Sequence, residues 1–144
     1  MSQGKYRPAA PRPTPRDRRG NPPVPPLEIN ARKHGGRTVV RLRGELDIAC
    51  SDELRRQLRS ARAEHGEHVV LDLEDLEFMD SQGLSVIVGC YKAVTAAGGS
   101  LALAGPRPLV RRTLEITGLH RRIPVLPTLA EAVAAGPGPA AQGS

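Results

Sequence analysis

The segment Met79-Asp80-Ser81-Gln82-Gly83 places a carboxylate, a hydroxyl and a glycine together at the predicted start of a helix. An aspartate directly before a helix accepts hydrogen bonds from the free amides of the first turn. With Asp80 as that cap, the Ser81 hydroxyl is not required for capping and is free to face solvent. Gly83 leaves the first turn without a side chain, so another backbone can approach closely. A purely structural interpretation also stays open, in which Asp-Ser is an ordinary cap and the glycine is merely tolerated.

Other residue types that carry chemistry do not fall into reactive patterns. Four histidines occupy predicted loops or element ends, without metal-ligand spacing to Cys, Asp or Glu. The sequence contains neither a phosphate-binding glycine loop nor a Gly-x-Ser-x-Gly nucleophile motif. Cys90 is best interpreted as a small buried hydrophobe, and nothing marks Cys50 as reactive. We therefore expect no enzymatic activity, no metal and no cofactor.

Positive charge is concentrated in two parts of the chain. The formal net charge is +6, and residues 1–26 hold six basic side chains against Asp17 alone. Because this segment is rich in proline, we expect a disordered tail that is either simply solvated or a tether for an acidic surface. The second cluster surrounds a predicted helix, and with aromatic residues at only 2% we interpret it as a solvated helix end rather than a nucleic-acid site. Its members are Arg107, Arg111, Arg112, Arg121 and Arg122.

Alternation of apolar and polar side chains predicts the strands that must position these residues. Residues 27–32 and 38–43 alternate on either side of Gly35-Gly36, which predicts a hairpin. Residues 69–73 predict a central strand, and residues 74–80 an acidic loop that leads to Ser81. Residues 100–104 predict another strand. Residues 123–126 predict a short edge strand, because Pro124 would break a central one.

Four helices are expected to alternate with these strands, over residues 52–64, 81–97, 107–117 and a short last segment ending at residue 135. Ser51 and Gly66 are the predicted ends of the first helix, Pro108 begins the third, and Thr128 with Glu131 forms a capping box for the last. The second helix should bury one broad apolar face. That face is formed by Leu84, Ile87, Val88, Tyr91 and Val94.

The element order predicts an α/β fold, with a mixed sheet of four to five strands and helices packed mainly on one face. Hydrophobic residues make up 39% of the chain, enough for one core. We expect one domain over residues 27–135, between the tail at 1–26 and a flexible C-terminal tail at 136–144. No apolar run is long enough to span a bilayer and no signal segment is present, so we expect a cytoplasmic protein.

The stretch Met79-Asp-Ser-Gln-Gly-Leu-Ser-Val-Ile-Val-Gly-Cys-Tyr-Lys resembles the signature of STAS domains, in particular of bacterial anti-sigma factor antagonists. Three further segments match the family in order and approximate spacing, so the resemblance covers about residues 27–135. They are Gly44-Glu-Leu-Asp47, Val69-Val-Leu-Asp-Leu and Ile116-Thr-Gly-Leu119.

This resemblance implies a switch in a stress response that regulates transcription. In such proteins the serine matching Ser81 is phosphorylated by an anti-sigma factor that is itself a serine kinase. The unphosphorylated antagonist binds that kinase and releases the sigma factor, and a metal-dependent serine phosphatase resets the switch. Asp80, Ser81, Gly83 and Leu84 match the partner-contact segment, and Asp47 matches an acidic residue beside it. ATP and magnesium belong to the kinase, so the resemblance implies no cofactor for this chain.

Two other interpretations stay open. A STAS domain of another class would be a scaffold in a stress-sensing assembly or a regulatory subunit of a membrane transporter ATPase, and co-purification with such an ATPase would indicate it. A nucleic-acid binder that uses the basic tail would lose salt-dependent DNA binding when residues 1–26 are deleted. We expect no direct nucleic-acid or membrane contact. We also expect a monomer or weak dimer, because the sequence shows no long heptad pattern.

Overall fold

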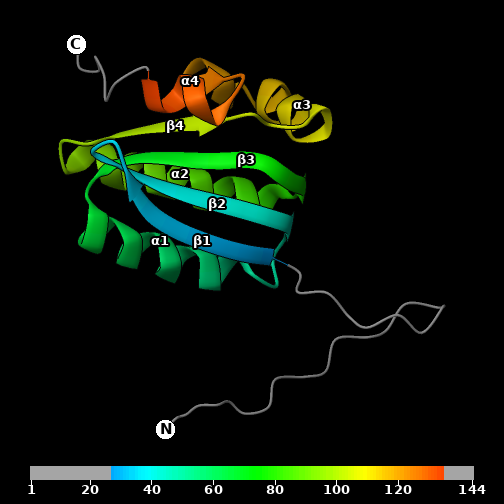
Figure 1. The fold of residues 1–144 in the computed structure, drawn as a ribbon. Helices are drawn as coiled ribbons and strands as arrows, with labels where there is room; N and C mark the ends of the chain where they lie inside the picture. The colour runs from blue at the N-terminus through cyan, green and yellow to red at the C-terminus, as the bar shows by residue number, and fades with distance from the viewer. Residues whose placement is uncertain (1–26, 135–144) are drawn as a thin grey trace, which may run out of the picture.

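The computed structural model describes residues 27–134, which form one mixed sheet with helices on both of its faces (Figure 1). The tails predicted at residues 1–26 and 136–144 lie outside the described residues. The strands are β1 (Leu27–His34), β2 (Arg37–Leu46), β3 (His68–Met79), β4 (Ser100–Ala104) and β5 (Val125–Leu126). The helices are α1 (Ser51–His65), α2 (Ser81–Ala96), α3 (Pro108–Thr117) and α4 (Leu129–Ala134), with a 3-10 turn at Leu119–Arg121.

The strands lie in the order β1-β2-β3-β4-β5, which confirms β3 as the central strand and β5 as an edge. β1 pairs antiparallel with β2 across the predicted Gly35-Gly36 turn, and both glycines have the positive φ angles that such a turn needs. The pairs β2–β3, β3–β4 and β4–β5 are parallel. The carboxyl ends of β2, β3 and β4 therefore meet at one side of the sheet, which we call the carboxyl edge. The chain leaves this edge to begin α1, α2 and α3.

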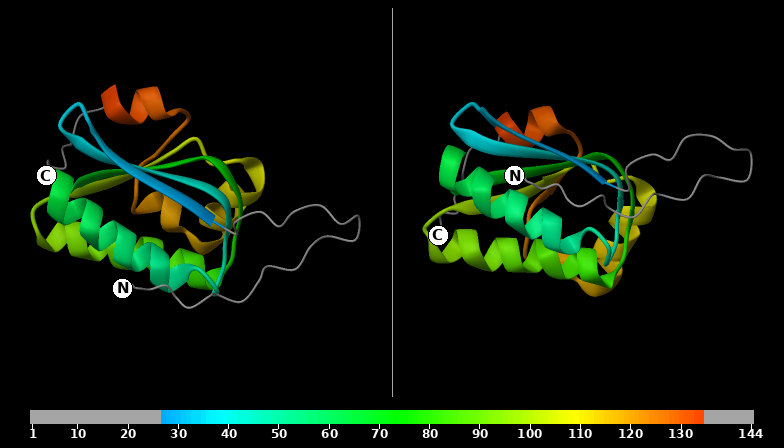
Figure 2. Two further views of the ribbon diagram at one scale, coloured as in Figure 1. Left: turned by 60° about the horizontal axis from the view of Figure 1, so that its bottom comes forward. Right: turned by 90° about the horizontal axis from the view of Figure 1, so that it is seen from below.

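The helices cover the two faces of the sheet unequally. Figure 2 shows α1 and α2 side by side on one face and α4 on the other. Leu58 of α1, Ile87 of α2 and Leu114 of α3 all belong to the larger core cluster. Ala132 of α4 packs with Val39 and other residues in a smaller cluster on the opposite face. The predicted α/β fold, with helices mainly on one face of a mixed sheet, is confirmed.

β3 is longer than predicted, and the acidic loop expected at residues 74–80 is wrong because the strand continues to Met79. Its pairing with β2 slips twice, and each slip accommodates one extra residue of β3, which is a β-bulge. Leu73, Leu76 and Met79 therefore all reach the larger core, although they are three residues apart rather than two. The slips lie between the pairs Arg41–Asp72 and Arg43–Asp75, and between Gly44–Leu76 and Glu45–Phe78.

α1 begins one residue earlier than predicted, so the assignment of Ser51 as its cap is wrong. Cys50 takes the N-cap position, and Ser51 is a buried residue of the first turn. The Ser51 hydroxyl donates to the Ile48 carbonyl at 3.2 Å instead of accepting from the helix. A turn closed by the Cys50 amide and the Asp47 carbonyl at 3.2 Å bends the chain before the helix and directs Ser51 inward.

The other predicted helix boundaries are close to those observed. Gly66 ends α1, and Gly118 ends α3 in the left-handed conformation, with φ at 77°. The amide of Glu131 donates to the Thr128 hydroxyl at 3.1 Å, which is one half of the predicted capping box. The buried face of α2 differs slightly from the prediction. Val86 and Cys90 are buried with Ile87 and Val94, whereas Leu84, Val88 and Tyr91 are only partly buried.

Candidate partner-binding site at the carboxyl edge

Asp80 connects two segments at the carboxyl edge. Its Oδ1 accepts from the amide of Gly83 at 3.0 Å, which confirms Asp80 as the N-cap of α2. Its Oδ2 accepts from the amide of Ile48 at 3.2 Å, and its own amide donates to the Leu46 carbonyl at 3.1 Å. One carboxylate therefore holds the loop between β2 and α1 against the first turn of α2.

Ser81 is the first residue of α2, and its side chain is exposed. Because Asp80 provides the cap, the Ser81 hydroxyl is not needed to start the helix. The Ser81 carbonyl accepts from the hydroxyl of Ser85 at 3.1 Å, one turn further along. A phosphate on the Ser81 hydroxyl would lie at a helix N-terminus, where free amides and the helix dipole stabilise an anion.

Asp47 lies in the same hydrogen-bonded unit, although it does not contact Asp80 directly. Its Oδ1 accepts from the amide of Ala49 at 3.0 Å within the turn that precedes α1. The amide of the intervening residue, Ile48, is the one held by Asp80. The two half-buried aspartates thus lie on either side of an anchored loop, and both belong to the edge that carries Ser81.

Gly83 faces the interior of the fold rather than solvent. A Cβ at this position would lie 2.6 Å from Leu46 Cγ and 2.9 Å from Met79 Cγ. The missing side chain is what allows α2 to pack closely against the ends of β2 and β3. Leu84, the next residue, packs against the larger core with part of its side chain and leaves the rest accessible.

Two exposed apolar side chains at this edge are absent from the sequence-based site. Ile48 is 68% exposed in the loop after β2, and Phe78 is 41% exposed as the next-to-last residue of β3. The position of Ile48 between Asp47 and the predicted helix is the feature of the sequence that points to its place at this site. The expectation of a loop over residues 74–80 leaves the direction of the Phe78 side chain undefined. Exposed apolar groups beside charged residues are typical of protein-binding surfaces.

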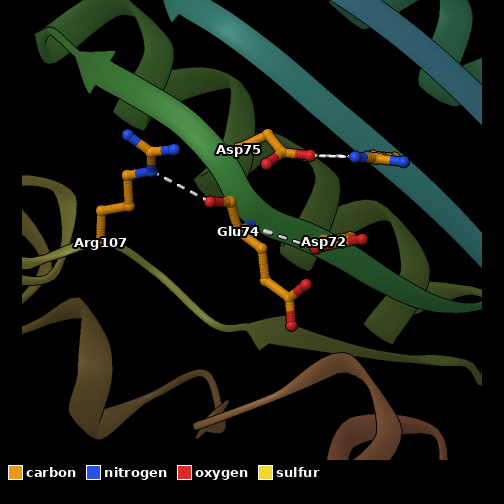
Figure 3. Close-up of polar contacts among 5 residues, drawn as sticks. Asp72, Glu74, Asp75 and Arg107 are labelled. Carbon is orange, nitrogen blue, oxygen red and sulfur yellow. Dashed lines mark hydrogen bonds and ion pairs between the residues drawn. The ribbon is translucent and has the colours of Figure 1, made fainter.

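The acidic residues in the middle of β3 have structural partners (Figure 3). The Glu74 amide donates to Asp72 Oδ1 at 3.1 Å across the first bulge, and its carbonyl accepts from Arg107 Nε at 3.0 Å. The Asp75 carboxylate pairs with the guanidinium of Arg41 on β2, which lowers the pKa of Asp75. Burial raises the pKa of Asp72. These contacts fix the bulge and the loop before α3.

Neither a metal site nor a reactive thiol was found in the part of the chain that the structure describes. No three His, Cys, Asp or Glu side chains converge there as metal ligands. Cys50 and Cys90 are free and buried, and burial raises the pKa of Cys90 to about 11. Such a thiol stays protonated near neutral pH. The described helices also include none that is both long and apolar enough to cross a membrane.

Comparison of the chain with known sequences identifies a matching family and similar proteins. Residues 28–132 match the family described as the STAS domain. The chain is 43% identical over 100 residues to the anti-sigma F factor antagonist of Paenibacillus polymyxa, a match that covers 69% of this chain and 86% of that relative.

Solved structures give the same result. The crystal structure of an anti-sigma factor antagonist from Mycobacterium paratuberculosis has a TM-score of 0.70 and 28% identity, and the match covers 76% of this chain and 92% of that one. The antagonist SpoIIAA in its unphosphorylated form gives a TM-score of 0.64 at 26% identity, covering 76% and 94% of the two chains. The phosphorylated form of SpoIIAA gives 0.59 at 25% identity, covering 76% and 97%.

Proposed function

Because the chain belongs to the STAS domain family, we propose that it is an anti-sigma factor antagonist whose partner-binding site is the carboxyl edge around Ser81. The arrangement of Asp80 and Ser81 carries this proposal. Asp80 caps α2 through its own carboxylate, so the adjacent Ser81 hydroxyl is exposed and available for modification. The similarity to proteins named as anti-sigma factor antagonists supports the same function.

The proposed contact surface combines charge with apolar area. Asp47, Asp80, Ser81 and Leu84 supply it directly, and Gly83 contributes by letting α2 lie close to β2 and β3. Ile48 and Phe78 extend the apolar part of the surface. A partner that covers this edge would bury apolar side chains at its centre and meet carboxylates around them, which is a common arrangement of protein interfaces.

Phosphorylation of Ser81 is proposed to switch this binding off. The anti-sigma factor, acting as a serine kinase, would transfer the γ-phosphoryl group of its ATP to Ser81 Oγ and release ADP and the hydroxyl proton. The phosphate adds close to two negative charges at a helix start that tolerates them, so the fold should persist. The interface with the partner should be weakened. Burial of a doubly charged group beside Asp47 and Asp80 without a matching cation raises the free energy of the complex by several kcal/mol. That cost corresponds to about a hundredfold or more in affinity.

In this proposal the chain is a substrate and a binding partner, not an enzyme. It supplies one hydroxyl, whereas ATP and magnesium are bound by the kinase. A metal-dependent serine phosphatase would remove the phosphate and return the antagonist to its binding state. The prediction of a cytoplasmic location fits partners that act on RNA polymerase.

The test measures the affinity of the full chain for its cognate anti-sigma factor before and after incubation with ATP. We expect the wild-type chain to gain one phosphate by intact mass and to lose affinity by about a hundredfold. Ser81→Ala should gain no phosphate and keep its affinity. Ser81→Glu should bind more weakly than Ser81→Ala but better than the phosphorylated chain, because it carries a single charge.

Ser85→Ala is the matched control, since Ser85 is exposed on the next turn of the same helix. This variant should still be phosphorylated and should still lose its affinity. Phosphate on a residue other than Ser81 would contradict the proposal. It would also be contradicted if the introduction of charge at Ser81 left the affinity unchanged. Co-purification with a transporter ATPase instead of a kinase would favour the other class of STAS domain.

A further inference from the structure

A groove runs between α1 and α2 on the helical face of the molecule, where the two helices lie side by side (Figure 2). Its cavity volume is about 250 Å³. Arg55, Arg59 and Arg62 from successive turns of α1 line one side, and Gly89 of α2 lies on the other. The floor includes the buried side chains of Leu58 and Cys90. We call this feature the α1–α2 groove.

The arginines of the α1–α2 groove keep hydrogen-bond donors for another acceptor. Arg55 pairs with Asp52 at 2.9 Å, whereas Arg59 has no ion pair within residues 27–134. Arg62 contacts Glu67 through Nε at 2.7 Å, its two terminal nitrogens have no hydrogen-bond partner among residues 27–134, and its side chain is only 19% exposed. A guanidinium presents its donors in a planar fork that suits carboxylate and phosphate oxygens.

Gly89 is a second, independent observation. A glycine inside a helix is destabilising relative to alanine, so its presence usually has a packing reason. Gly83 has such a reason in Leu46 and Met79, but a Cβ at Gly89 would meet nothing within 4 Å. The fold therefore does not require a glycine at position 89. Its effect is to widen the α1–α2 groove opposite the arginines.

We propose that the α1–α2 groove binds a small amphipathic anion, with a carboxylate or phosphate group on a short apolar chain. Arg59 and Arg62 would hold the anionic group, and the apolar chain would lie over Leu58 and Cys90 beside Gly89. The volume is below the 300–1,000 Å³ typical of drug-sized ligands, so the chain must be short. Burial raises the pKa of Cys90 to about 11, so its thiol stays neutral and adds no opposing charge.

This site is separate from the proposed Ser81 switch, but it shares the same two helices. α1 begins directly after the Asp47 loop, and α2 begins at Ser81. A ligand held between the helices would contact both α1 and α2, which begin at the carboxyl edge. The binding itself needs no anti-sigma factor, so it can be tested on the isolated protein whatever the outcome at Ser81.

The test titrates the full chain, labelled with nitrogen-15, with octanoate below its micelle-forming concentration while amide chemical shifts are recorded. We expect saturable shifts centred on the amides of Arg59 and Gly89. Arg59→Gln should raise the Kd about tenfold, because a charge-assisted contact to the anionic group is lost. Gly89→Leu, which places a side chain in the groove, should abolish saturable binding. Octyl phosphate in place of octanoate distinguishes the two anionic groups.

Arg56→Gln is the matched control, because Arg56 lies on α1, pairs with Glu53 and does not line the groove. It should leave the Kd for octanoate unchanged. The proposal is overturned if octanoate gives no saturable shifts, or if acetate and inorganic phosphate bind as tightly as octanoate. Equal weakening by Arg56→Gln and Arg59→Gln would overturn it as well, since that result indicates only general attraction of anions. Unchanged octanoate binding by a folded Gly89→Leu variant would overturn it too.

Discussion

Asp80 caps α2 through its carboxylate, whereas the adjacent Ser81, the proposed phosphorylation site, does not, so substitution should separate the two residues. Asp80→Ala removes the acceptor of the Gly83 and Ile48 amides, so we expect the free energy of unfolding to fall by about 1–2 kcal/mol. Ser81→Ala should change it by less than about 0.5 kcal/mol, because the side chain is exposed and alanine suits a helix. Urea denaturation of both variants measures the difference. A larger loss in Ser81→Ala than in Asp80→Ala would show that the serine itself holds the helix start.

Asp72 gives the stability of the fold a pH dependence whose sign is opposite to the one usual for an aspartate. Burial raises its pKa above the ordinary value of 3.8, and the charges of Glu74 and Asp75 raise it further, while the hydrogen bond from the Glu74 amide and the charge of Arg41 oppose the shift. The folded state therefore holds the proton more tightly than the unfolded state. The stability that this provides is complete below pH 3.8 and is lost as the pH rises through the raised pKa.

Asp72→Asn keeps an oxygen for the Glu74 amide, so it should gain stability relative to wild type at neutral pH and lose that advantage in acid. Asp75→Asn is the control with the opposite sign, because Arg41 lowers the pKa of Asp75. The small stabilisation that the wild-type Asp75 carboxylate provides is present above the ordinary pKa of an aspartate. It is lost as the pH falls through the lowered pKa of Asp75. Denaturation of the three proteins at neutral and acid pH measures both effects. A stability advantage of Asp72→Asn over wild type that grows in acid would contradict a raised pKa of Asp72.

At the scale of elements, two glycines of α2 predict opposite responses to the same substitution. Gly83→Ala places a Cβ against Leu46 and Met79, so we expect a loss of about 1–3 kcal/mol in the free energy of unfolding. Gly89→Ala meets open space and gains helix propensity, so we expect an increase of roughly 0.5–1 kcal/mol. Thermal and urea unfolding of the pair measures both. A Gly83→Ala protein as stable as wild type would show that α2 can shift away from β2 without cost.

The sequence predicts elements well where one local pattern decides the outcome. Alternation around Gly35-Gly36 identifies the hairpin, and the order Asp80-Ser81 identifies the cap of α2. It fails where contacts between distant segments decide. The turn at Asp47 directs Ser51 into the fold, which the capping preference of serine alone does not show. The inward position of Gly83 depends on Leu46, which no local pattern places beside it.

For the whole molecule, the described residues form two core clusters, and the basic, proline-rich composition of residues 1–26 offers little apolar area to add to them. We therefore expect deletion of residues 1–26 to leave the thermal midpoint nearly unchanged. Differential scanning calorimetry of the full chain and of residues 27–144 at the same salt concentration measures this. A drop of many degrees in the shorter chain would mean that the basic segment contributes to the folded state.

The two bulges of β3 also determine which face of the sheet the later side chains of the strand occupy. Each adds one residue relative to β2, and together they add an even number, so Met79 lies on the same face as Leu73. Deletion of Glu77 would remove one extra residue and with it one bulge, so Met79 would keep Leu46 as its partner and stay in the core. Deletion of Val70, which pairs with Val39 before both bulges, removes no bulge and would turn Leu71 toward the opposite face of the sheet. The chain without Glu77 should therefore keep more of its core packing, and unfold at a higher urea concentration, than the chain without Val70.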